Sequence, residues 1–142
     1  MDKQIIDQKL ESLRRCLERI KQKCPASSQA LVADIDLQDI IALNLSRAIQ
    51  ISVDIGAHLI SEMPVPAPTT MGQTFDILAQ TEIISQELAT NLKKAVGFRN
   101  IAVHNYEVIN WEIVHKIAQQ HLIDFNAFAI QVLCYMDADS RH

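Results

Sequence analysis

The sequence predicts an all-α protein, an up-and-down antiparallel helical bundle of four to five main helices. Apolar residues recur at three- and four-residue steps along most of the chain, which is the spacing of one helix face. Proline is confined to position 25 and to residues 64–68, so long stretches are free of helix breakers. No segment shows the strict apolar–polar alternation of a half-buried strand.

Residues 2–23 read as an amphipathic helix that stops before Pro25. Ser27 or Ser28 then has the side chain to cap a short helical turn that reaches Asp34. The connection between the first two long helices is therefore expected to be brief.

A second long helix is predicted from about Asp36 to Glu62, and it is apolar around most of its circumference. Such a helix is either central to its bundle or covered by a second subunit. Its polar residues recur at three- and four-residue steps and share one face: Asn44, Arg47, Gln50, Asp54, His58 and Ser61. This stripe is either a solvated outer surface or one wall of a functional cleft.

The second half of the chain follows the same pattern. Prolines at every second position in 64–68 predict an extended connector, followed by a short helix at 71–80. A long helix is expected from about Glu82 to Val103, with Thr81 or a neighbour at its start. Asn110 reads as the N-cap of a last helix to about Asp137. Its apolar residues are expected to pack inward, and they include Trp111, Ile113, Val114, Ile117, Leu122, Phe125, Phe128, Ile130, Val132 and Leu133.

The length of 142 residues predicts one domain, residues 1–142, with room for a proper core. Cys16, Cys24 and Cys134 are odd in number and lack Cys-x-x-Cys spacing, so neither a disulfide framework nor a zinc site is indicated, and the pattern favours reduced thiols in the cytoplasm. His115 and His121 lie six residues apart, which is not ligand spacing on one helix face, so no metal site is expected. No cofactor motif is present.

Charged residues alternate with apolar ones at the N-terminus, which argues against a signal peptide. We expect no stretch to reach the roughly 18 to 20 apolar residues of a membrane span, and hence a soluble, cytoplasmic protein. The net charge is −4, so attraction to nucleic acid has to come from a local basic patch.

Residues 97–106 carry the side chains best suited to chemistry. Arg99 offers a fixed cation for phosphate, His104 a proton-transfer group, and Tyr106 a hydroxyl that can be modified. On an ideal helix, however, residues five apart are separated by about 140° around the axis, so Arg99 and His104 cannot converge on a regular helix. Two solutions are open: the helix ends between them, or the arginine side chain reaches round to the imidazole.

The string from Val96 to Tyr106, with its Arg-x4-His-x-Tyr motif preceded by Gly-Phe and followed by an Asn-initiated helix, resembles the HEPN superfamily. Within that superfamily it is similar to the HepT toxins of prokaryotic toxin–antitoxin pairs, over most of the chain. The resemblance implies a metal-independent ribonuclease in which Arg99 and His104 are catalytic and Asn100 lines the phosphate site. We expect Asp54 or Gln50 to orient Arg99.

The resemblance also implies partners. Two subunits would bring their motifs together in a cleft at a homodimer interface, where the basic residues that bind RNA would be concentrated: Arg47, Lys93, Lys94 and Arg99. A cognate MntA-type nucleotidyltransferase, the antitoxin, would attach adenylate to Tyr106 and so block the cleft.

Two other readings remain open at this point. The chain is alternatively a non-catalytic HEPN module that binds nucleotide or substrate for a separate nucleotidyltransferase, which predicts nucleotide binding without RNA turnover. A scaffolding helix bundle is the third reading, and it predicts that replacing Arg99 and His104 affects stability alone.

Overall fold

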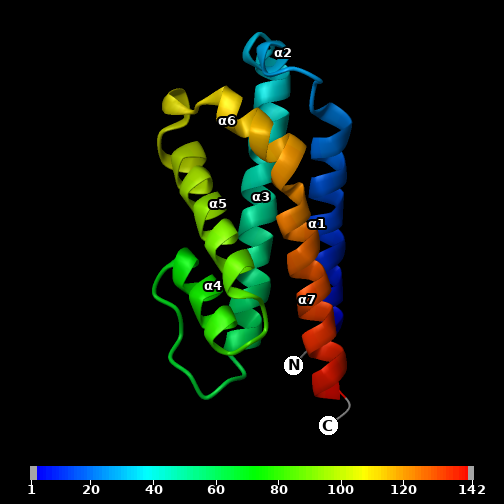
Figure 1. Ribbon diagram of the computed structural model, residues 1–142, viewed down its shortest axis with the longest axis vertical. Coiled ribbons are helices and arrows are strands. Elements are labelled where there is room, and N and C mark those ends of the chain that lie inside the picture. Colours follow the sequence, from blue (N-terminus) through cyan, green and yellow to red (C-terminus); the bar gives the residue numbers. More distant parts are fainter. Residues whose placement is uncertain (1–2, 141–142) are drawn as a thin grey trace.

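The computed structural model describes residues 3–140, and these form a helical bundle (Figure 1). Four long helices build it: α1 (Lys3–Lys23), α3 (Ile35–Ile60), α5 (Gln86–His104) and α7 (Leu122–Ser140). Three shorter helices connect them: α2 (Ser28–Val32), α4 (Met71–Gln80) and α6 (Trp111–Lys116). The long helices run alternately up and down, which confirms the predicted fold class. Residue 2, at the start of the predicted first helix, lies outside the described residues.

Helix α3 lies in the middle of the bundle, with α1 and α7 on one side and α5 on the other (Figure 1). Asp34 caps its start, since the carboxylate Oδ1 accepts a hydrogen bond from the Leu37 N–H at 3.1 Å. Fully buried residues follow along its whole length: Ile41, Leu45, Ala48, Ile49, Ile55 and Leu59. The expectation of a central helix is confirmed.

By length and composition, α3 is long and apolar enough to cross a membrane, so the expectation that no stretch reaches this size was wrong. Half of its most apolar window is buried inside the bundle. The apolar character of α3 is accounted for by its place in the core, because a helix surrounded by other helices needs apolar residues on most of its circumference.

Several helix starts are where the sequence placed them. Ser27 Oγ accepts from the Ala30 N–H at 3.2 Å, and Thr70 Oγ1 accepts from the Gln73 N–H at 3.1 Å. Asn110 Oδ1 accepts from the N–H groups of Glu112 and Ile113, as its predicted role as N-cap requires.

Helix α5 begins four residues later than predicted. Glu82 adopts a left-handed backbone conformation with φ of 63°, which reverses the chain after α4. Ile83 and Ile84 are buried as loop residues, and both donate their N–H groups to the Leu78 carbonyl. Ser85 caps the helix instead, accepting from the Leu88 N–H at 3.2 Å.

The predicted single last helix is divided. A π-helical turn, Ile117–His121, separates α6 from α7 and changes which side chains face inward. Three residues that were expected to pack inward are exposed: Ile113, Ile130 and Leu133. Phe128 of α7 packs inward as expected, and its ring meets the ring of Phe75 of α4 edge to face, with ring centroids 6.0 Å apart.

Candidate active site

The Arg99–Tyr106 motif spans the end of α5 and the turn that follows it. The helix continues without a break through His104, and the Asn105 N–H still bonds to the Ile101 carbonyl at 2.8 Å. A 3₁₀ turn, Tyr106–Val108, comes next. The helix therefore does not end between Arg99 and His104, and this first solution to their divergence was wrong.

Arg99 points toward α3. Its Nη2 donates to Oε1 of Gln50 at 3.1 Å, and Nε2 of Gln50 donates in turn to Oδ1 of Asp54 at 2.9 Å. The guanidinium thus lies against Gln50 rather than reaching round to the imidazole, so the second solution is not what the structure shows either. The Gln50 and Asp54 side chains form the relay through which the arginine is held.

His104 lies exposed in the last turn of α5. Within residues 3–140 its ring makes no hydrogen bond or ion pair, so it remains available to a ligand. Asn100 is also exposed, one residue after Arg99, whose Nη1 lies 3.5 Å from the Asn100 Oδ1. Arg99 and His104 therefore leave the helix on different sides, about 140° apart.

Tyr106 is held at two points. Its hydroxyl donates to Oδ1 of Asp39, on α3, at 2.5 Å, and its ring meets the Trp111 ring edge to face with centroids 5.7 Å apart. The side chain is nevertheless 39% exposed. Desolvation, the hydrogen bond to Asp39 and the negative charge of Asp39 all raise the pKa of the Tyr106 phenol above its usual value of 10.0.

Asp39 is a site residue that reasoning from the sequence missed. It precedes Gln50 by eleven residues, which is about three helical turns, so both side chains project from the same face of α3. That periodicity is the signal that the sequence carries, although the predicted polar stripe begins only at Asn44.

The rest of the predicted polar stripe of α3 does not behave as one surface. Asn44 is buried and donates to the Ile40 carbonyl at 2.8 Å. Nε2 of His58 is buried without a hydrogen-bond partner among the described residues. Gln50 is the stripe residue that meets Arg99, and Asp54 contacts Gln50 in turn.

The predicted RNA-binding residues have different surroundings in a single copy of the chain. Arg47 is exposed on α3 and lies near α1, where burial raises the pKa of the Cys16 thiol and the Arg47 charge opposes that rise. Lys93 forms an ion pair with Asp76 of α4 at 3.1 Å. Lys94 lines a groove on another side of α5.

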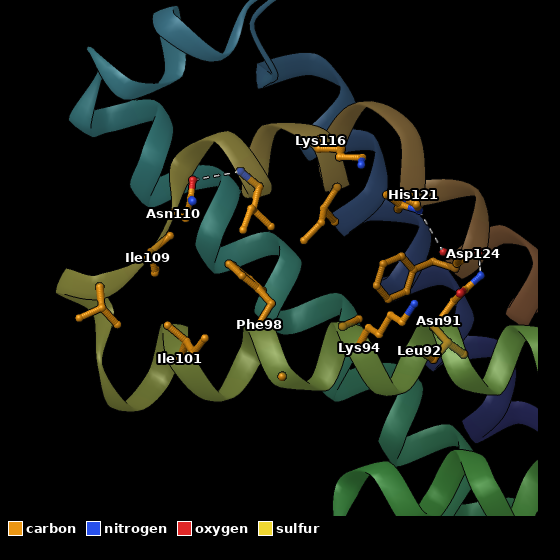
Figure 2. Close-up of a pocket in the computed structure, with 16 residues that line it drawn as sticks. Asn91, Leu92, Lys94, Phe98, Ile101, Ile109, Asn110, Lys116, His121 and Asp124 are labelled. Atoms are coloured by element: carbon orange, nitrogen blue, oxygen red, sulfur yellow. Dashed lines mark hydrogen bonds and ion pairs between the residues drawn. The ribbon is translucent and has the colours of Figure 1, made fainter.

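That groove lies between α5 and the α6–α7 segment and has a volume of about 650 Å³ (Figure 2). Its apolar lining includes Phe98, Ile101, Ile113, Ile117 and Phe125. At one end Asp124 accepts from Nδ2 of Asn91 at 3.3 Å and faces Nδ1 of His121 at 3.6 Å. The groove therefore presents a mainly apolar surface next to the motif.

These features define a class: an α-helical bundle with an arginine, a histidine and a tyrosine at the end of one long helix. A family model described as Ribonuclease HepT-like matches residues 13–132. The chain belongs to this HepT-like family of HEPN proteins, and it is a ribonuclease.

Named relatives support this assignment. The chain is 41% identical to the mRNA nuclease HepT of Shewanella oneidensis over 87% of this chain and 92% of the relative. It is 26% identical to the tRNA nuclease HepT of Aphanizomenon flos-aquae over 93% and 90% of the two chains. Among solved structures, the tri-AMPylated HEPN toxin of Shewanella oneidensis in complex with MNT antitoxin superposes with a TM-score of 0.87. That toxin is 39% identical, and the match covers 94% of this chain and 99% of the toxin.

Proposed function

We propose that this protein, as one domain, is the toxin of a toxin–antitoxin pair and cleaves RNA in the cytoplasm without a metal ion. The observation that carries the proposal is the pose of Arg99, whose guanidinium is fixed by the Gln50–Asp54 relay on the helix that ends in the exposed His104. A fixed cation and a free imidazole are the groups that such cleavage requires.

The reaction would begin with the ribose 2′-hydroxyl attacking its own 3′-phosphate. One group has to remove the proton from that hydroxyl, another has to protonate the leaving 5′-oxygen, and a cation has to stabilise the added charge on phosphorus. Arg99 would supply the cation and His104 the proton transfer, with Asn100 lining the phosphate site. Arg47, Lys93 and Lys94 would contact RNA farther along the strand.

One imidazole cannot readily serve as base and acid in the same step, which favours a homodimer in which two copies of His104 share one cleft. The surface around the motif supports this arrangement. Leu43, four residues after Asp39 on α3, is 50% exposed, and Val103, four residues after Arg99 on α5, is 52% exposed. A second copy of the chain would cover such apolar side chains and bring the second motif to the first.

An MntA-type nucleotidyltransferase would be the antitoxin and would attach adenylate to Tyr106. Two observations support this: Tyr106, the last residue of the motif, is exposed, and a similar toxin is tri-AMPylated in complex with MNT antitoxin. Added phosphates next to Arg99 would cancel its positive charge and fill the cleft.

Cleavage assays on purified protein test the nuclease mechanism. We expect RNA cleavage to proceed in EDTA, and Arg99→Ala and His104→Ala each to reduce it by at least about 100-fold, the usual minimum for losing a proton-transfer or charge-stabilising group. Both variants should retain the helical circular dichroism of the wild type, because neither side chain belongs to the core. Cleavage that survives both substitutions would refute the mechanism, and binding of ATP without any RNA turnover would favour the non-catalytic module.

A further inference from the structure

We infer that Asp39 is the proton acceptor in the modification of Tyr106, so that the toxin itself supplies the base for its own silencing. This inference rests on the proposed function, because it concerns the adenylylation of Tyr106. It adds a catalytic residue that lies outside the Arg99–His104 pair and belongs to a different helix.

The geometry places the carboxylate on the reacting atom. Oδ1 of Asp39 lies 2.5 Å from the Tyr106 hydroxyl oxygen, across a separation of 67 residues in sequence. This is the distance of a short hydrogen bond from a hydroxyl to a carboxylate, so Asp39 is within reach of the phenolic proton. Trp111 contacts the ring of Tyr106, so the hydroxyl is held toward the carboxylate.

The carboxylate has no competing partner. Among residues 3–140, Asp39 forms no ion pair with Lys, Arg or His, and its one side-chain hydrogen bond is the one it accepts from Tyr106. Asp39 is exposed, so a proton that it receives can pass on to water. If Asp39 served only to fix the end of a helix, an ion pair with a cationic neighbour would serve equally well.

The chemistry requires a base at this point. The pKa of the phenol is raised, so the hydroxyl is protonated at neutral pH and is a weak nucleophile. Attack by the Tyr106 oxygen on the α-phosphorus of a nucleoside triphosphate forms a phosphorus–oxygen bond and breaks the bond to the bridging oxygen, and pyrophosphate leaves with that electron pair. The phenolic proton passes to Asp39 as the new bond forms, and the carboxylate later releases it to solvent.

Steady-state modification by the cognate nucleotidyltransferase with ATP tests the inference, with intact mass as the readout. We expect Asp39→Asn to lower kcat by about 100-fold or more while the KM for the toxin stays within about threefold, because general-base catalysis contributes about 10²–10⁴-fold. Asp39→Glu should recover part of the rate. The matched control is Asp36→Asn, which removes an exposed carboxylate one turn earlier on α3 and should be modified like the wild type. The helical circular dichroism of Asp39→Asn should match that of the wild type, which would show that the variant is folded.

A second substrate separates proton removal from positioning of the ring. Fluorinated tyrosine at position 106 has a more acidic phenol and depends less on a base, so the defect of Asp39→Asn should shrink with it. An equal defect for both phenols would show that Asp39 only positions the ring, which contradicts the inference. Wild-type rates for Asp39→Asn, or an effect on KM alone, would overturn it as well. An unmodified wild-type Tyr106 would instead refute the proposed adenylylation itself.

Discussion

At the residue scale, the pose of Arg99 depends on a neutral amide rather than on a carboxylate. Gln50 can do this because its amide accepts from the guanidinium through Oε1 and donates to Asp54 through Nε2. The negative charge of Asp54 is thereby kept one side chain away from Arg99. The arginine is oriented without being neutralised, which leaves its charge for a phosphate.

Gln50→Ala should therefore impair cleavage without unfolding the protein. A hydrogen bond to a charged group contributes about 1.5–3 kcal/mol, and the partial exposure of both partners places this one near the lower end, so we expect kcat/KM for RNA to fall about tenfold. Thermal unfolding should shift little, since Gln50 is outside the core. Gln8→Ala, an exposed glutamine of α1, is the matched control and should behave as the wild type. Full activity of Gln50→Ala would mean that Arg99 needs no orienting partner.

At the element scale, the sequence was sufficient for the helices that carry clear local signals. Ser27 and Asn110 mark helix starts by their cap chemistry, and the apolar circumference of α3 indicated a central helix. The late start of α5 was missed because Glu82 adopts a left-handed conformation that a non-glycine residue rarely takes. The π-helical turn after α6 was missed because the periodicity of the apolar residues does not reveal one extra residue in a turn.

The residues of the candidate site also divide into those that the sequence predicted and those that it did not. Arg99, His104 and Tyr106 could be identified from their types and spacing, and the link from Arg99 to Gln50 and Asp54 was anticipated. Spacing could place Asp39 on the same face of α3 as Gln50, but its contact with Tyr106, 67 residues away, depends on how α3 and the turn after α5 pack. The partner that a side chain of α5 meets likewise depends on how the helices pack. Lys93, for example, forms an ion pair with Asp76 of α4.

Two helical glycines give a prediction about the α3–α4 contact. A Cβ at Gly56 would lie 2.6 Å from Cγ2 of Thr74 and 2.9 Å from Cδ1 of Leu78, whereas a Cβ at Gly97 would meet nothing within 4 Å. Gly56→Ala should lower the free energy of unfolding by about 1–3 kcal/mol, because both neighbours are buried in a packed core and have to shift.

Gly97→Ala is the matched substitution and should raise the free energy of unfolding by up to about 1 kcal/mol, because alanine favours the helix over glycine by about this amount. Urea denaturation followed by circular dichroism measures both values. If both variants raised or both lowered the free energy of unfolding, the close contact of α3 with α4 would not be the reason for glycine at position 56.

At the scale of the whole molecule, a single copy of the chain holds the parts of the site without assembling them. Arg99 points toward α3, His104 projects to solvent, and about 140° around the helix axis separates them. Leu43 and Val103 lie exposed on the two helices that frame Arg99. A second copy placed against this surface would bury the apolar side chains and bring a second imidazole within reach of the first phosphate site.

A heterodimer of wild-type and His104→Ala subunits tests this arrangement directly. Two different affinity tags allow the mixed dimer to be purified away from both homodimers after co-expression. If one imidazole acts as base and the other as acid in a shared cleft, the mixed dimer keeps only one of the two groups, and its cleavage rate should fall by about 100-fold or more, far below half of the wild-type rate. A dimer of two wild-type subunits carrying the same two tags is the control and should be fully active. Half of the wild-type rate in the mixed dimer would show that each protomer cleaves alone, and failure of the two tags to purify together would refute the homodimer.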